Sequence, residues 1–224
     1  FAKLLETLDD IDGVLRYRFV TSHPKDLSDD LIRVMQSSYK ICEHIHLPMQ
    51  SGDDTILNRM NRYYDYNTYL KRIQALRKAM PEIAITTDLI AGFPGETEEQ
   101  FEATLNAMRE IEFDYAFCFK YSPREGTTAS NYADQISEAT RLARLQKMID
   151  LQREITLRKF KAQIGKTVEV LIEDYSKKSK EQVSGKTRDY KIAVLDGKIE
   201  QVGTLVSARV ADATAGTLLC APTC

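Results

Sequence analysis

The stretch PEIAITTDLIAGFPGET, residues 81–97, decides the fold of this chain. Residues 83–91 are branched and apolar, with a single carboxylate, Asp88, among them. A near-continuous apolar run between a proline and a glycine predicts a strand that is buried on both faces, as in a parallel sheet. The Gly-Phe-Pro-Gly that follows at residues 92–95 predicts a tight turn directly after this strand.

A helix is predicted immediately after the turn, at residues 98–111. Thr97 precedes it and Gln100 stands three residues later, which is the pattern of a capping box. A strand that ends in glycines and turns into a helix presents free backbone N–H groups and a positive dipole end to a ligand. Together with Asp88, which can accept from a sugar hydroxyl, this pattern favours a nucleotide-type site. The alternative is that the glycines serve only the turn.

Length and composition set the broad class. A chain of 224 residues fits one large or two modest domains, and its formal net charge of −2 argues against bulk-charge binding of nucleic acid but allows a local basic patch. No run of eighteen apolar residues exists, so we expect no contact with a membrane. We expect inert, buried thiols and a reducing, cytoplasmic location, because no disulfide or zinc spacing relates Cys42, Cys118, Cys220 and Cys224.

Predicted strands and helices alternate over the first two thirds of the chain. The strands are expected at residues 14–20, 43–47, 83–91 and 115–121, and the helices at 28–39, 55–60, 68–80 and 98–111. Such alternation is typical of a parallel α/β sheet or barrel, and four strands are too few for a closed barrel of eight. Because the chain opens at Phe1 rather than Met, we expect part of a barrel whose first strands precede Phe1.

The pattern changes after a long predicted helix at residues 138–163. Short β-rich runs separated by turn residues follow from Gly165 onward, at residues 167–172, 182–186, 191–195, 205–210 and 217–220. Five short strands in this space predict a small all-β barrel of the OB type, a fold that often binds RNA. We therefore predict two domains, residues 1–163 and 164–224.

Polar clusters follow each predicted strand of the first domain. Because ligands of parallel barrels lie at the carboxyl ends of the strands, these clusters predict one shared site. His44 and His46 share a strand face, and without a third ligand we expect them to pack or hydrogen-bond rather than to bind metal. The clusters are Thr21-Ser22-His23, Gln50-Ser51-Gly52, Asp88 with residues 92–96, and Tyr121-Ser122 with Arg124.

At these residues the chain resembles the radical S-adenosylmethionine (SAM) enzymes, and within them the methylthiotransferases. The motifs that carry the resemblance are HLPMQSG (46–52), MNRYYDYNTYL (60–70), DLIAGFPGETEEQF (88–101) and KYSPREGT (120–127). Residues 165–190, with GKTVEVLIED and SGKTRDY, resemble the TRAM module. The resemblance implies a partial TIM-type radical SAM barrel followed by an OB-like TRAM barrel. It is greatest for the tRNA-modifying (MiaB-type) branch, which converts N6-isopentenyladenosine beside the anticodon to its 2-methylthio derivative.

The resemblance also implies roles for individual residues. Gln50 and Asp88 would hydrogen-bond the SAM ribose, Ser51 would also belong to the cofactor site, and Arg62 would pair with the methionyl carboxylate. Two alternatives stay open: Arg62 as a solvated charge at a helix end, and core packing for the alternating aromatic residues 117, 119 and 121. The remaining implied contacts are Ala91 and Gly92 at the adenine edge, Phe119 or Tyr121 on its face, and Ser22 with Arg124 in the substrate pocket.

The expected partner is tRNA, at its anticodon stem-loop. Residues 165–224 hold nine basic and eight acidic side chains, so an ordinary solvated surface is the alternative. Placement favours RNA, because a lysine-rich loop between the first two strands of an OB-type barrel often contacts nucleic acid. The expected RNA-binding residues are Lys177, Lys178, Lys180, Lys186 and Arg188.

The cluster ligands of the family are not found in this chain. The family chemistry needs a Cys-x-x-x-Cys-x-x-Cys loop for a 4Fe-4S cluster that cleaves SAM, and a second cluster in a separate domain. We therefore expect no metal site in this chain, two clusters in the full-length protein, and no activity from this part alone. The sulfur source and the reductant stay open.

Three rival functions remain open at this point. The first is methylthiolation of a ribosomal-protein aspartate or of another tRNA adenosine. The second is a non-catalytic RNA-binding protein on a degenerate barrel. The third is a phosphate-binding barrel enzyme that uses Gly92–Gly95.

Overall fold

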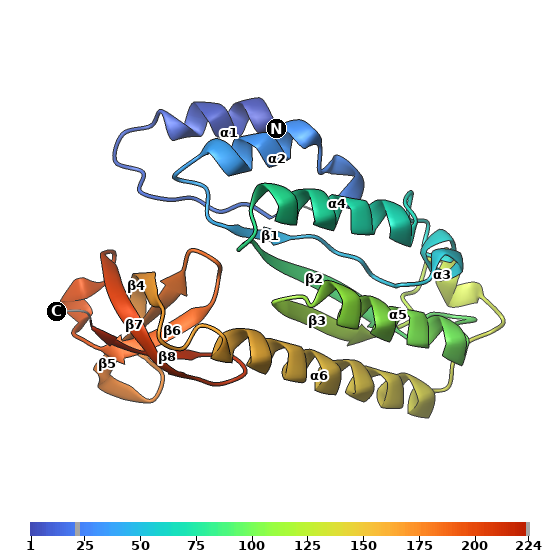
Figure 1. Ribbon diagram of the computed structural model, residues 1–224. Coiled ribbons are helices and arrows are strands. Elements are labelled where there is room, and N and C mark those ends of the chain that lie inside the picture. Colours follow the sequence, from blue (N-terminus) through green and yellow to red (C-terminus); the bar gives the residue numbers. More distant parts are fainter. Residues whose placement is uncertain (21–22, 223–224) are drawn as a thin grey trace. The chain divides into compact units, whose positions relative to one another are not determined.

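The computed structural model describes residues 1–20 and 23–222, which form two compact units. The first unit comprises residues 1–41 and 45–152, and the second comprises 42–44 and 153 onward (Figure 1). The division falls within helix α6 (Glu138–Lys161), whereas the predicted domain boundary, which stays a prediction, follows residue 163.

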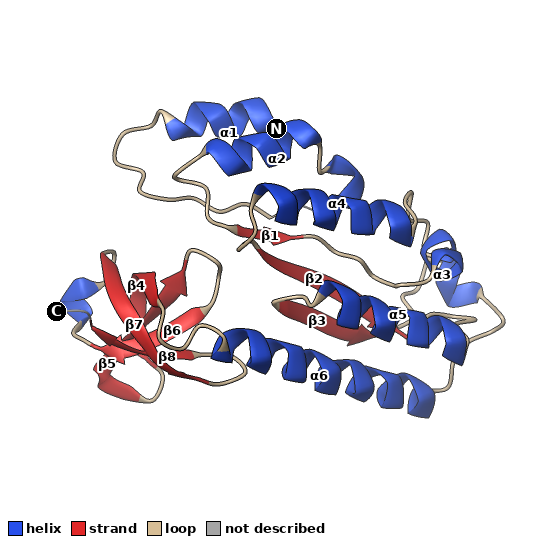
Figure 2. Cartoon of the chain, viewed as in Figure 1, coloured by secondary structure: helices blue, strands red, loops and turns tan. Residues whose placement is uncertain are grey.

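A three-stranded sheet organises the first unit. Its strands are β1 (His44–His46), β2 (Ala84–Ala91) and β3 (Tyr115–Lys120), in the order β1-β2-β3 (Figure 2). Strands β2 and β3 are parallel, with Thr86 opposite Tyr115 and Ala91 opposite Lys120. The parallel sheet predicted from the apolar strand is therefore confirmed.

Two helices of the first unit begin at the caps that the sequence predicts. The hydroxyl of Ser28 accepts from the N–H of Leu31, and Thr97 forms the predicted capping box with Gln100. No helix of the described residues is long and apolar enough to cross a bilayer. Besides α6, the α-helices are α1 (Ala2–Asp9), α2 (Asp29–Ser37), α3 (Asp54–Arg59), α4 (Tyr66–Ala79) and α5 (Glu98–Ile111), with short 3-10 turns at Pro24–Asp26 and Thr128–Asn131.

The strand predicted at residues 14–20 is wrong. In its place, Tyr17 forms a single parallel bridge to Ile41, with its N–H donating to the carbonyl of Lys40. The Tyr17 hydroxyl is instead fixed to the carbonyl of Leu5 at 2.8 Å. Alternating apolar residues predict a strand only where a neighbouring strand completes the ladder, and the described residues place none beside this segment beyond that bridge.

The two faces of the sheet differ in burial. In β3, Ala116 is 7% exposed, whereas Tyr115, Phe117 and Phe119 are 43% exposed or more. In β2 only Asp88 and Ile90 are partly exposed, so the expectation of burial on both faces fails near its carboxyl end. The buried face packs on side chains from α4 and α5, among them Tyr69, Ile73, Leu76, Phe101, Leu105 and Met108.

The second unit is a closed five-stranded barrel in the order β4-β5-β6-β8-β7. The predicted all-β barrel is confirmed; three strands contain and extend their predicted ranges, and β6 and β8 each begin one residue later than predicted. The core is aliphatic, with Val170, Val183 and Leu195 at most 1% exposed. The strands are β4 (Thr167–Ser176), β5 (Ser179–Thr187), β6 (Ile192–Asp196), β7 (Leu205–Ala213) and β8 (Leu218–Pro222), with a 3-10 turn at Ile199–Gln201.

Gly185 controls the approach of β5 to β4. It lies opposite Ile172, and a Cβ at this position would stand 1.9 Å from the carbonyl oxygen of Leu171. Gly185→Ala should therefore lower the free energy of unfolding of the barrel by about 1–3 kcal/mol. Gly216→Ala is the matched control, because a Cβ there meets nothing within 4 Å. Equal unfolding midpoints for the two variants of the full-length protein would contradict the close-approach argument.

Gln50 follows β1 in a left-handed conformation, with φ 70°. Two hydrogen bonds hold it there: its N–H donates to the carbonyl of Asp88 at 2.8 Å, and its carbonyl accepts from Ile90 at 3.0 Å. A side chain in this region costs about 1–2 kcal/mol relative to glycine. Gln50→Gly should therefore be more stable than Gln50→Ala by that amount in urea unfolding without ligand. A Gly variant that is no more stable than the Ala variant would show that the backbone relaxes.

Candidate functional site

Two adjoining clefts lie at the carboxyl ends of the three parallel strands. Their volumes are about 620 and 520 Å³, and they share Gln50, Ile90, Tyr121 and Ala129. The first cleft is lined by residues at the end of α3, and the second by residues of β3 and the loop that follows it. Further lining residues are Arg59, Arg62, Phe93 and Tyr132 in the first cleft, and Asp88, Phe119, Arg124 and Thr127 in the second.

Other groups of the protein occupy the space and the N–H donors of the glycine turn at residues 92–95, beside these clefts. A Cβ on Gly92, which has φ 72°, would lie 2.4 Å from Cγ of Arg141. The N–H of Gly92 donates to Oε2 of Glu96 at 2.7 Å, and the N–H of Gly95 donates to the carbonyl of Asp134 at 2.8 Å. These N–H groups are therefore not free, which corrects our expectation and argues against a phosphate site on this turn.

Three polar groups of the clefts have no protein partner among the described residues. The side-chain amide of Gln50 and the guanidinium of Arg62 make no hydrogen bond or ion pair within residues 1–20 and 23–222. The hydroxyl oxygen of Tyr121 is buried without a hydrogen-bond partner there. A buried hydroxyl is nearly always paired, so the unpaired Tyr121 hydroxyl is the exception here, whereas Arg62 is only partly buried. The three groups are available to a polar ligand.

Asp88 lies on the wall of the second cleft, next to His46. Its Oδ2 is 3.4 Å from Nε2 of His46, whose Nδ1 is 3.0 Å from the hydroxyl oxygen of Thr86. His46 therefore hydrogen-bonds, as its sequence position predicts. A carboxylate has about four acceptor sites, so Asp88 retains capacity for ligand hydroxyls while His46 holds it in place.

The side of the site that holds Arg62 is electropositive. Burial lowers the pKa of His23, and the charges of Arg62 and Lys25 lower it further against the opposing effect of Asp26. Burial raises the pKa of Tyr64 to about 12, against the opposing effect of Arg62. The arginine is thus the cation that an anionic ligand group would meet.

The predicted cofactor and substrate residues separate into two groups. Ser51 is fully buried, where its Oγ accepts from the N–H of Asp53 at 3.2 Å. Ala91 and Gly92 lie beside the clefts without lining them, and the carbonyl of Ala91 accepts from Tyr121 at 2.8 Å. Ser22 lies outside the described residues. The roles assigned to all these residues stay predictions; the residues that line the clefts are Gln50, Arg62, Asp88, Phe119, Tyr121 and Arg124.

The contribution of the loop at residues 127–135 to the site was not predicted from the sequence. Arg59 pairs with Asp134 at 2.9 Å and lies over the ring of Tyr132, 4.9 Å from its centroid. This loop therefore lies along the first cleft, which Thr128, Ala129 and Tyr132 line. Its place after a barrel strand is a usable signal, since such loops carry binding sites. Nothing in the sequence, however, connects Arg59 to a residue 75 positions later.

The second unit has a groove of about 450 Å³ on its barrel. Lys177, Lys178 and Lys186 line it, above apolar side chains that include Ile192 and Leu219, which are 45% and 40% exposed. The turn between β4 and β5 holds only Lys177 and Lys178. Lys180 belongs to β5 and does not line the groove, and Arg188 pairs with Glu43 at 2.7 Å within the same unit.

Comparison with known proteins matches both units. Residues 1–108 match the radical SAM superfamily, and residues 161–220 match the TRAM domain. A tRNA-2-methylthio-N(6)-dimethylallyladenosine synthase of Desulfitobacterium hafniense is 47% identical over 97% of this chain and 49% of its own length. One of Thermoanaerobacter sp. is 46% identical over 97% of this chain and 46% of its own length. The chain spans about half the length of the curated relatives it matches.

A solved structure supports the fold independently. Coproporphyrinogen III oxidase from Escherichia coli, described as a radical SAM enzyme, matches with a TM-score of 0.55 and 19% identity, over 69% of this chain and 36% of its own. At this identity the likeness shows the fold alone. Residues 1–108 of the chain are thus similar to the radical SAM superfamily, and residues 161–220 are similar to the TRAM domain.

Proposed function

We propose that this chain is the SAM-binding and RNA-contacting part of a tRNA methylthiotransferase. The full-length enzyme would convert N6-isopentenyladenosine (N6-dimethylallyladenosine) next to the anticodon to its 2-methylthio derivative. The observation that carries the proposal is the convergence of Gln50, Arg62 and Asp88 on two adjoining clefts, with no protein partner for the first two among the described residues. Identities of 46–47% to synthases of that name support the choice of reaction.

The clefts fit SAM by the chemistry of their donors and acceptors. Arg62 would pair with the carboxylate of the methionyl group, where a planar guanidinium forms two parallel hydrogen bonds. Asp88 and the amide of Gln50 would bind the ribose hydroxyls, and the adenine would lie against Phe119 or Tyr121. The orphaned hydroxyl of Tyr121 would gain a partner from the ligand. Arg124, at the rim of the second cleft, would face the substrate nucleoside.

The iron–sulfur clusters of the family have no ligand set among these residues. Within the described part of the chain, no three His, Cys, Asp or Glu side chains gather as a metal site. The buried Cys42 and the half-buried Cys118 and Cys220 are free thiols, and burial raises the pKa of Cys118 to about 12, which disfavours a thiolate ligand. The clusters, which supply reductive cleavage of SAM, would be held by other residues of the full-length protein.

The basic groove of the TRAM domain supports an RNA substrate. Three lysines stand over an apolar floor, which suits single-stranded RNA because phosphates meet the charges while unstacked bases meet the apolar surface. A single-stranded loop is the part of a tRNA that offers unstacked bases. The anticodon stem-loop therefore fits this groove better than a double-stranded arm.

The role of Asp88 is tested by Asp88→Asn in the full-length protein. Loss of a charged hydrogen bond should weaken SAM binding by about 1.5–3 kcal/mol, measured by equilibrium dialysis. The thermal midpoint without ligand should barely move, because Asp88 is partly exposed. Asp30→Asn, an exposed carboxylate paired with Arg33, is the matched control and should leave SAM binding unchanged. Unchanged SAM affinity with early unfolding would make Asp88 a structural residue.

The role of the groove is tested by the double reversal Lys177→Glu/Lys178→Glu. Binding of an anticodon stem-loop should weaken, and the slope of log K against log salt should flatten by roughly 0.7 for each RNA phosphate that is no longer neutralised. The control is Lys166→Glu/Arg209→Glu, two exposed residues of the same unit that do not line the groove. Equal affinity and slope for both double variants would remove the groove from the interface. Tight binding of a ribosomal protein in place of RNA would favour the aspartate-modifying branch.

A further inference from the structure

Glu96 is a fully buried carboxylate with no part in the proposed ligand contacts. Its side chain is 0% exposed, and its Oε2 accepts from the N–H of Gly92 at 2.7 Å and from Nη1 of Arg144 at 2.8 Å. The other oxygen, Oε1, is buried with no hydrogen-bond partner among the described residues. A buried charge destabilises a fold unless it is well paired, so this placement calls for an explanation.

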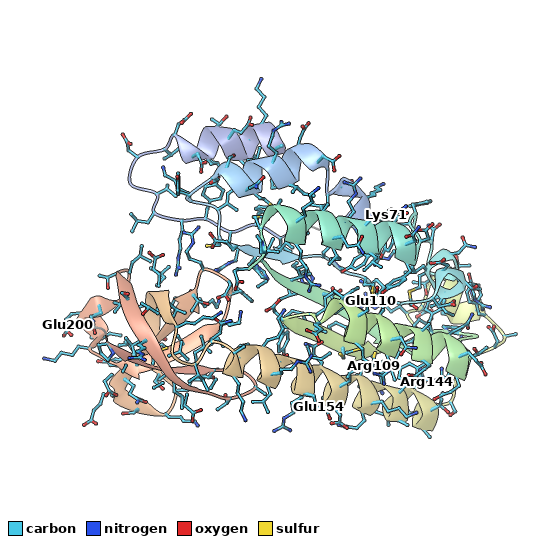
Figure 3. The ribbon with its side chains drawn as sticks, in the orientation of Figure 1. Lys71, Arg109, Glu110, Arg144, Glu154 and Glu200 are labelled. Carbon is cyan, nitrogen blue, oxygen red and sulfur yellow. The ribbon has the colours of Figure 1, made fainter. Side chains whose placement is uncertain are left out.

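Arg144 connects this carboxylate to two helices. Its guanidinium also donates to the backbone carbonyl of Glu96 at 2.9 Å and to the side chain of Glu98, in the first turn of α5, at 3.2 Å. The arginine is 7% exposed and lies over the ring of Phe101. Figure 3 labels it on α6, where that helix runs beside α5. The glycine turn, α5 and α6 are thus joined at one side chain.

The hydrogen bonds of Arg144 fix the turn that shapes the first cleft. Gly92 stands between Ile90 and Phe93, and both of these line that cleft. The N–H of Gly92 and the guanidinium of Arg144 both donate to Oε2 of Glu96, so the arginine fixes the acceptor on which the turn depends. The neighbouring Arg141 acts on the same turn, because its stem fills the space above Gly92 and its Nη1 donates to the carbonyl of Tyr121 at 2.8 Å.

We propose that Arg144 is a positioning residue for SAM, which acts through Glu96 on the Gly92 turn. The inference rests on the proposed function, because it takes SAM as the ligand of the clefts. Burial raises the pKa of Glu96, while the hydrogen bond from Gly92 and the charge of Arg144 lower it. Without the arginine, the buried carboxylate would keep only the N–H of Gly92 as a donor, with Glu98 as its charged neighbour, and its hold on the turn would weaken.

The test measures SAM affinity by equilibrium dialysis of the full-length protein with its clusters reconstituted. Arg144→Met should weaken SAM binding by about tenfold or more, because a buried charged carboxylate that has lost its ion-pair partner shifts away and displaces the Gly92 turn. Lys147→Met is the matched control from the same helix: it breaks an ion pair with Glu98 that is 57% and 58% exposed, and SAM affinity should not change. Glu96→Gln/Arg144→Met should recover most of the affinity, since a neutral amide oxygen still accepts from Gly92.

Acidity gives a second readout that loss of packing would not produce. The groups that face Glu96 are Arg144 from α6, Glu98 from α5 and the N–H of Gly92. In Arg144→Met the pKa of Glu96 rises further, so the neutral acid predominates at lower pH. The loss of SAM affinity in this variant should therefore be smaller at pH 6 than at pH 8, relative to the parent.

Each outcome decides the inference. If Arg144→Met does not fold, Arg144→Lys keeps the charge with fewer donors and should show a smaller loss of SAM affinity at unchanged stability. Parent-like affinity in the variants that fold, or no recovery in the double variant, overturns the positioning role but leaves SAM binding intact. If the parent protein binds no SAM and Asp88→Asn behaves identically to it, the proposed function and this inference are overturned together.

Discussion

The constraint on which the first unit depends is the absence of a side chain at Gly92. The stem of Arg141 occupies the space in which a Cβ would lie, 2.4 Å from its Cγ, and φ at this residue is 72°. The glycine therefore satisfies a steric and a backbone requirement at one position. Because α6 approaches so closely here, its Arg141 and Arg144 reach the ends of β2 and β3 and fix the walls of the clefts.

Much of this arrangement is predictable from sequence, for identifiable reasons. The strand at residues 84–91 and the helix at 98–111 are fixed by local signals, an apolar run, a glycine turn and a capping box. The barrel strands follow from short β-rich runs between turns. The segment around Tyr17 carries the same kind of local signal and forms only one bridge, because a ladder also needs a neighbour that local signals do not specify.

The residues of the candidate site likewise divide into those that local sequence signals predict and those that depend on tertiary neighbours. Gln50, Asp88 and Arg124 are predictable because each follows or ends a parallel strand, and such ends meet at one edge of a sheet. The pairs Arg59–Asp134 and Arg144–Glu96 are not predictable, since each joins helix and loop positions that are 75 and 48 residues apart. The resemblance to a family named the residues that would touch the ligand, but only the structure shows which of them face a cleft and which, like Ser51, are bonded inside the core.

Polar groups that bond to each other hold the fold in place, whereas polar groups left without a protein partner are available to a ligand. Glu96 and Arg144 are buried and bonded to each other, whereas Gln50 and Arg62 face the clefts with their polar groups unused among the described residues. Buried polar groups are usually paired within the fold, and both an unpaired polar group and a strained backbone are common at binding sites. Gln50 meets both conditions, since it combines a left-handed backbone with an unused amide at the point the two clefts share. If the clefts bind SAM as proposed, that coincidence puts Gln50 at the centre of the site, with the Gly92 turn as its adjacent, internally bonded wall.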